Sequence, residues 1–382
     1  MTSTEPQPSP SPPPPRPPFQ FTLRTLLIVV TLFAFICSWL AVKREQGMAA
    51  QVKALQKERI DVLTTLVEDY TSQFRVGTSP NEFLIGAETD LVNAQLAATD
   101  NPEQRVAVLT EALKREREIM KFASPVCGRD EVDVEWWRSI SLYTQIRLLR
   151  VQKSPAVQIR ALQKERIEAL TKVVQIRESQ YWVGTIDREA VVSAEAALVD
   201  AQVDATGNRD ERVALLTQAL KRESALLEIA GSRFGSGSVT EGDVNRARSL
   251  LLTTKIRLLR DGRREDMADQ LKAAHKERVE TLITLVKHDE AHYRAGVTDC
   301  ESVVNTETAL VNAQVEATDS RDERVALLTE ALKRETALSK IVDGRFQAGS
   351  VSEADVYRAR LLLLDARIRL LREGSLWGAA TK

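Results

Sequence analysis

Apolar residues recur along most of this chain at spacings of three and four positions, which is the period of an amphipathic helix. The clearest run is a heptad seam near the C-terminus, with spacings of 4, 3, 4 and 3: Tyr357, Leu361, Leu364, Ile368 and Leu371. No segment alternates with period two over the length of a strand. The pattern therefore predicts an all-α fold of long helices in coiled-coil-like contact.

Short turn signals separate the predicted helices. In five places an aromatic residue is followed three positions later by Gly, which can take the left-handed conformation that ends a helix. Capping boxes follow four of these turns and mark the start of the next helix. The five glycines are Gly77, Gly184, Gly237, Gly296 and Gly349, and the capping pairs are Ser79 with Glu82, Thr240 with Asp243, Thr298 with Glu301, and Ser352 with Asp355.

Self-similarity organises the whole chain. The run L-T-E-A-L-K-R-E begins at Leu109 and Leu328 and returns with one change at Leu216, while I-R-L-L-R also occurs three times. The offsets of 107 to 112 residues predict three tandem repeats, each made of two helical hairpins. The predicted repeats cover residues 50–155, 156–266 and 267–373, and the third contains helices at about 268–293, 299–317, 321–344 and 352–373. The pattern leaves open whether each repeat closes as its own bundle or all three stack into a rod.

A transmembrane anchor is predicted before the repeats, within residues 19–49. Its core, residues 25–42, is uncharged between Arg24 and Lys43 and would span roughly 27 Å as a helix, close to the hydrocarbon thickness of a bilayer. Trp39 lies near one end, where interfacial aromatic residues are expected. No small-x-small cleavage site follows, so an uncleaved anchor is favoured over a signal peptide.

The two ends of the chain are predicted to be unstructured. Residues 1–18 are rich in Pro and Ser and read as a disordered tail, and residues 374–382 as a flexible C-terminus. Basic residues are more numerous after the predicted anchor than before it, which by the positive-inside rule places the repeats in the cytoplasm. The rule weakens beside a long domain, so the orientation stays open.

One family resemblance is carried by the turns. The segment from Arg345 to Arg360 combines an aromatic-x-x-Gly-x-x-Ser turn with a helix rich in Val and Ala, and it resembles the helical hairpin of the bacterial outer-membrane efflux (TolC-like) family. The resemblance covers the hairpins, without that family's β-barrel. It implies that the hairpin tips meet a periplasmic adaptor protein. The implied contact positions are Gly77, Gly184, Gly237, Gly296 and Gly349 with Thr298 and Ser352.

Charge gives no sign of a nucleic-acid partner. Lys and Arg (53) nearly cancel Asp and Glu (54), and the two signs are interleaved, so the chain lacks a basic stripe. Glu111 with Arg115 and Glu330 with Arg334 lie at i,i+4 spacing, which predicts ion pairs along single helices.

Candidate chemistry is sparse. His288 and His292 share a helix face and could bind zinc, but the zincin pattern requires Glu where Asp289 stands, and the other repeats lack the cluster. We interpret it as a solvated helix face and predict no metal, no cofactor and no enzymatic activity. The adjacent Trp136 and Trp137 are interpreted as helix or repeat packing. The three cysteines stand singly and are read as inert apolar residues: Cys37, Cys127 and Cys300.

These observations predict a membrane-anchored coiled-coil structural or interaction protein of the bacterial cell envelope. It would sit in the inner membrane by one span, hold its repeats in the periplasm and bind a protein partner, with self-association made plausible by the heptad seams. The alternatives are a component of a TolC-like efflux or secretion assembly and a cytoplasm-facing membrane scaffold.

Overall fold

The computed structural model describes residues 23–77, 81–123, 131–183, 185–186, 188–237, 239–262 and 267–375. Over these residues the chain is all-helical, with no strand. The tail at 1–18, Gly184 and most side chains of the predicted anchor, including that of Arg24, lie outside the described residues. So do the side chain of Cys37, the residue Cys127 and residues 376–382.

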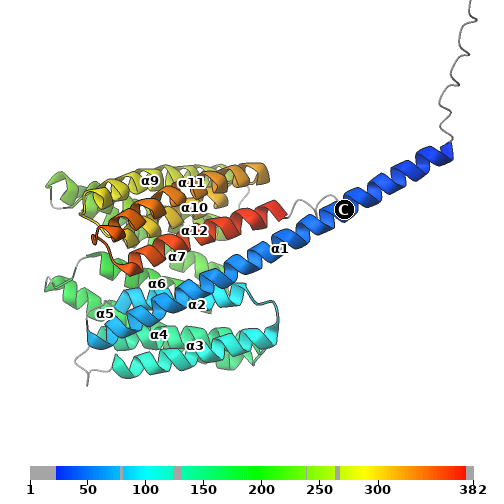
Figure 1. The fold of residues 1–382 in the computed structure, drawn as a ribbon. Coiled ribbons are helices and arrows are strands. Elements are labelled where there is room, and N and C mark those ends of the chain that lie inside the picture. Colours follow the sequence, from blue (N-terminus) through cyan, green and yellow to red (C-terminus); the bar gives the residue numbers. More distant parts are fainter. Residues whose placement is uncertain are drawn as a thin grey trace, which may run out of the picture.

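The helices follow one another as antiparallel neighbours (Figure 1). Those of the first predicted repeat are α1 (Leu23–Val76), α2 (Asn81–Ala97), α3 (Pro102–Phe122) and α4 (Glu131–Val151). Those of the second are α5 (Ala156–Trp182), α6 (Arg188–Ala205), α7 (Arg209–Gly235) and α8 (Glu241–Gly262). Those of the third are α9 (Ala268–Arg294), α10 (Cys300–Glu316), α11 (Arg321–Gln347) and α12 (Glu353–Ser375), each within three residues of the predicted bounds.

Helix α1 is longer than any other described helix, with 54 residues, and it joins two predicted parts of the chain. Its backbone continues from the uncharged segment at 25–42 into the first helix of the first repeat, so the predicted boundary at residue 49 is not a break in structure. Among the residues that the structure describes, no helix combines the length and the apolar character needed to cross a membrane. Trp39 and Lys43 lie together, with the ammonium 4.9 Å from the ring centroid.

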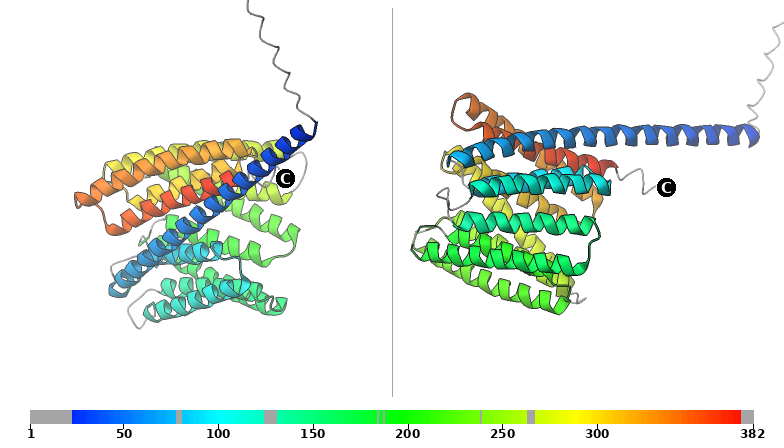
Figure 2. Two further views of the ribbon diagram at one scale, coloured as in Figure 1. Left: turned by 45° about the vertical axis from the view of Figure 1, so that its right-hand side comes forward. Right: turned by 90° about the horizontal axis from the view of Figure 1, so that it is seen from below.

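The chain closes on itself. Helix α4 packs on α5 and α8 packs on α9, and in the same way α12 packs back along α1 (Figures 1 and 2). Arg59 of α1 pairs with Asp365 at 3.0 Å, and Arg360 of α12 pairs with Glu58 at 2.6 Å. The helices therefore form a closed ring, neither three separate bundles nor an open rod. We call the contact between α12 and α1 the closure seam.

A hollow of about 380 Å³ lies at the closure seam, with walls from α1, α2, α10 and α12. The guanidinium of Arg358 lies over the rings of Tyr70 and Phe83, with centroid distances of 5.2 and 4.9 Å. Asp90 also faces this hollow. Its side chain keeps contact with solvent, but the surrounding protein partly desolvates the carboxylate and so raises its pKa. The seam is therefore held by charged and aromatic groups together.

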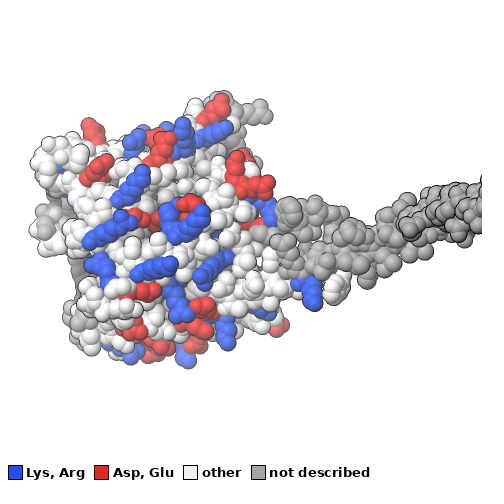
Figure 3. All heavy atoms as spheres, turned by 45° about the horizontal axis from the view of Figure 1, so that its top comes forward, with Lys and Arg blue, Asp and Glu red and all other residues white. Residues whose placement is uncertain are grey.

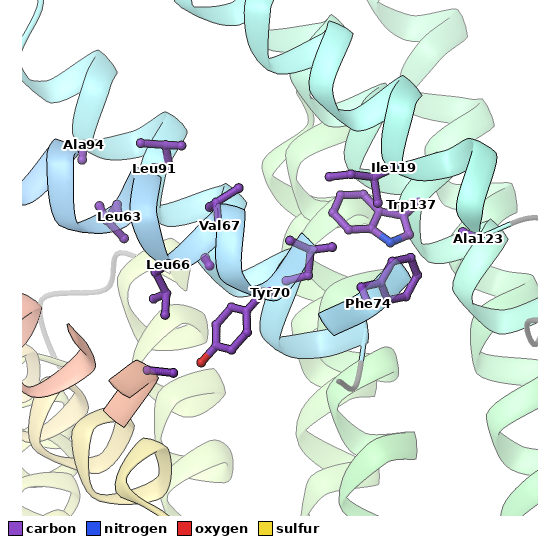
Figure 4. Close-up of a cluster of buried hydrophobic side chains, with 13 residues drawn as sticks. Leu63, Leu66, Val67, Tyr70, Phe74, Leu91, Ala94, Ile119, Ala123 and Trp137 are labelled. Carbon is purple, nitrogen blue, oxygen red and sulfur yellow. The ribbon is translucent and has the colours of Figure 1, made fainter. Parts of the chain in front are cut away.

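The largest apolar cluster fills the first predicted repeat and joins all four of its helices (Figure 4). Trp137 of α4 is fully buried in it beside Phe74 and Ile119, and its indole N–H donates to the side-chain oxygen of Asn81. The partly buried Trp136 packs against α5. The prediction that this Trp pair serves packing is confirmed.

Arginine residues of α3 and α11 pair across helices rather than along them. Arg115 bonds Glu88 of α2 at 2.8 Å, and Arg334 bonds Glu307 of α10 at 3.1 Å. The predicted i,i+4 pairs to Glu111 and Glu330 are therefore wrong. Glu88 and Glu307 are almost fully buried, and a buried carboxylate without a cation is far more costly than an exposed one. The arginines consequently pair with the buried glutamates. The exposed Glu111 and Glu330 pair instead with lysines three residues further along the same helix.

A second set of glutamates is buried at equivalent places in the three predicted repeats. Burial raises the pKa of Glu116 and Glu223 to about 7. The hydroxyls of Thr144 and Thr254 donate to these two carboxylates, at 2.6 and 2.9 Å, and partly offset the rise. In the third repeat the place of this Thr is taken by Ala366. There, burial and the neighbouring charges of Glu307 and Asp365 raise the pKa of Glu335 to about 8.

Candidate docking surface at the hairpin tips

The predicted turns end their helices by left-handed glycines. Gly77, Gly237, Gly296 and Gly349 have φ between 70° and 80°, as the sequence predicts. The N–H of each donates to the carbonyl of the aromatic residue three positions earlier, at 2.9 to 3.1 Å. A Cβ on Gly237, Gly296 or Gly349 would meet no atom within 4 Å, so the backbone conformation, and not space, requires glycine there.

The residues at which the helices begin after these turns agree only in part with the predicted caps. Ser352 and Asp355 form the expected capping box, with the Ser352 hydroxyl 2.7 Å from the carboxylate, and Thr240 with Asp243 does the same. The predicted box of Thr298 with Glu301 is wrong. Asp299 caps α10 instead, by accepting the N–H of Ser302 at 2.9 Å, because its carboxylate sits one residue closer to the first turn. Ser79 lies outside the described residues.

The odd-numbered helices all end, and the even-numbered helices all begin, at one end of the ring, which Figure 1 shows at the left. The start of α1 and the end of α12 lie at the opposite end. The site glycines that the structure describes, with Thr298 and Ser352, are therefore brought to a common face. Trp39 and Lys43, of the predicted anchor, lie in the N-terminal half of α1, away from that face.

Exposed apolar side chains gather on this same end. Every hairpin tip carries one, and together they define what we call the tip surface: Val76, Phe122, Val183, Phe234, Val297 and Phe346. The three valines keep 71 to 74% of their surface exposed, which is unusual for β-branched apolar residues in otherwise polar turns. Among the residues described, only Trp39, Val157 and Ile229 are further large apolar side chains with comparable exposure.

Charged residues of both signs border the tip surface. The last turns of five odd-numbered helices carry Arg75, Lys121, Arg233, Arg294 and Arg345, and the first turns of the even-numbered helices at the same end carry acids that include Asp133, Asp243, Glu301 and Asp355. Arg75 lies over the ring of Phe122, 4.7 Å from its centroid, and so links two neighbouring tips. Elsewhere basic and acidic side chains are interspersed, as the face in Figure 3 shows. The tip surface thus combines apolar centres with a border of mixed charge.

Sequence reasoning selected the tip glycines but missed the side chains that a partner would touch. The glycines shape the turns, whereas the exposed area belongs to Val76, Val183 and Val297 beside them. A signal was present, because each valine is an apolar residue at a turn where no helical face can bury it.

The histidine cluster of α9 is not the solvated face that the sequence predicts. Asp289 is only 1% exposed; it accepts from Arg246 of α8 at 3.0 Å and from Thr306 of α10 at 2.7 Å. The ring of His288 stacks on His292 and lies against the backbone of Gly242. Tertiary packing of α8 on α9 covers these groups. No group of three or more His, Cys, Asp or Glu side chains in the described ranges could hold a metal ion.

Cys300 is the one cysteine whose side chain the structure describes, and it is buried in an apolar cluster of the third predicted repeat. Burial raises the pKa of its thiol to about 12, so the thiolate is scarce at neutral pH. The interpretation of this residue as an apolar packing element is confirmed.

No model of a known protein family matches the chain, and no curated protein matches its sequence. The chain's own residues therefore carry the functional argument.

Proposed function

We propose that this protein is a membrane-anchored docking scaffold, whose three tandem repeats close into a ring that presents the tip surface to a protein partner. The observation that carries the proposal is the gathering of six exposed apolar side chains on one end of the ring. An isolated exposed apolar residue needs no explanation, but a shared apolar face with a polar border is typical of an interaction site.

The chemistry of the tip surface specifies the partner. Valine and phenylalanine centres favour an apolar counterpart, and the mixed charges around them favour charged side chains of both signs at its rim. Because the tips come from similar repeats, a partner with several equivalent contact elements would meet them best. We therefore propose a protein partner with an apolar face rimmed by charged side chains.

The position of the anchor supports the same function. The uncharged segment at 25–42 forms the N-terminal part of α1, and this part projects from the end of the ring opposite the tips. Insertion of this segment in a bilayer would therefore direct the tip surface away from the membrane. We place the protein in a bacterial inner membrane with the ring in the periplasm, where such a surface would reach an envelope component.

Site-specific photo-crosslinking in cells tests the docking role. A photoreactive residue at Val297 should form a discrete adduct with one partner, and the same residue at Val157 should not. Val157 is as exposed as Val297 but lies at the opposite end of the ring, so it is a matched control. Equal crosslinking patterns at the two sites would exclude the tip surface as the docking site.

Introduction of charge at the tip supplies the affinity test. The combined change of Val76, Val183 and Val297 to Lys should weaken partner binding at least about 100-fold, because each buried valine contributes about 1.5–3 kcal/mol. The Val157→Lys variant should bind normally. Retained affinity in the triple variant with unchanged helicity would refute the proposal.

Two alternatives make different predictions about location. A component of a TolC-like efflux or secretion assembly is favoured by the closed ring of hairpins, and a cytoplasm-facing scaffold by the basic residues after the anchor segment. External protease applied to spheroplasts should remove a C-terminal tag if the ring is periplasmic, while a cytoplasmic marker stays intact. A protected tag would favour the cytoplasmic scaffold.

A further inference from the structure

The second predicted repeat contains a cavity of about 500 Å³ between α6, α7 and α8, near the tip end of the bundle. Its walls are mainly apolar and include Val192, Leu226, Ala230 and Leu250. This volume is in the range of sites that hold small organic molecules. We call it the repeat-2 cavity.

The other two repeats show how the same place is filled when it serves packing alone. Sequence offsets align Ala247 of the second repeat with Trp137 of the first, and that indole is fully buried in the core. They align Ala230 with Val342 of the third, which is also fully buried in a packed cluster. The repeat-2 cavity therefore lies where the sister repeats have larger side chains or tighter packing.

Arginine at the mouth of this cavity also differs between repeats. Arg345 of the third repeat lies over the ring of Tyr293, 4.4 Å from its centroid, and donates to the Tyr293 carbonyl at 2.7 Å. Its equivalent, Arg233, lines the repeat-2 cavity instead, and no acidic side chain among the described residues pairs with it. The other arginine of the wall, Arg246, is already bound by Asp243 and Asp289.

We propose that the repeat-2 cavity binds a small aromatic carboxylate, with the ring system among Ala230, Ala247 and Leu226 and the carboxylate on Arg233. An indole already occupies the equivalent place in the first repeat, which shows that such a bundle accepts a flat bicyclic group there. Guanidinium is the side chain best suited to a carboxylate, which it can hold by two parallel hydrogen bonds. The cavity shares Arg233 with the border of the tip surface, but its walls lie between α6, α7 and α8, so the inference does not rest on the docking role.

Calorimetric titration of the full-length protein with 2-naphthoate tests the site, with 2-naphthamide as the uncharged analogue and empty detergent micelles as the blank. The Ala247→Trp variant should lose naphthoate binding by at least tenfold, because its indole would fill the cavity as Trp137 fills its equivalent. Ala230→Val is a milder change that should weaken the binding of both probes. The fold should be kept, because Val342 occupies the equivalent place in the third repeat.

The charged contact is tested separately. Arg233→Gln should weaken the binding of naphthoate at least fivefold and leave the binding of naphthamide unchanged. The matched control Arg345→Gln should alter the binding of neither probe. Three results would overturn the proposal: no heat from either probe up to millimolar concentration, binding that survives both cavity-filling changes in folded protein, or equal effects of the two arginine variants.

Discussion

Replacing Ala366 with Thr should stabilise this protein only at alkaline pH. Glu335 is buried at a place where the other two repeats supply a threonine hydroxyl to the equivalent glutamate. A new hydroxyl on α12 would donate to the Glu335 carboxylate and favour its ionised form. The pKa of Glu335, about 8, should then fall toward the value of about 7 at Glu116 and Glu223.

The size and sign follow from proton linkage. A carboxyl whose pKa is raised by folding favours the folded state below the pKa of the unfolded chain, and this advantage is lost as the pH rises through the folded pKa. If the pKa of Glu335 in the folded protein falls by about one pH unit, about 1 kcal/mol of the stability lost at high pH is regained. The gain should therefore be about 1 kcal/mol at pH 9 and close to zero at pH 6.

Urea denaturation followed by circular dichroism at pH 6 and pH 9 measures the effect. Ala366 is 2% exposed, so the added volume itself could cost stability, and Ala366→Val serves as the control of similar size without the hydroxyl. The difference between the Thr and Val variants isolates the hydrogen bond. Thr144→Ala in the first repeat should show the opposite change. A Thr-minus-Val difference that is the same at both pH values would refute the reasoning.

Two further changes test the packing of α8 on α9. Asp289→Ala should destabilise the protein by about 3 kcal/mol, because Arg246 loses its buried carboxylate; a loss below 1 kcal/mol in urea denaturation would mean that water already solvates this pair. Gly242→Ala would place its Cβ 2.6 Å from the His288 ring and should cost about 1–3 kcal/mol. His288→Ala should relieve that cost in the double variant, and simple additivity of the thermal shifts would contradict the close approach.

Local sequence determined the helices and most of their ends. The aromatic-x-x-Gly turns and the caps at Thr240 and Ser352 act over a few residues, so their geometry is readable from spacing alone. The four helices of the third repeat follow for the same reason. At Thr298 the local signal was ambiguous, because the adjacent Asp299 is an equally good cap.

Only the tertiary structure decided which residues meet across helices. Closure of α12 on α1, the pairing of Arg115 with Glu88 and the burial of Asp289 each join residues far apart in the chain. Helical periodicity shows that a face is apolar or charged, but it does not identify the helix that covers it. The same face is solvated when it lies on the outside of the ring and desolvated at a seam. Burial makes an unpaired charge costly, so the three-dimensional arrangement, and not the spacing of charges along one helix, selects the partners.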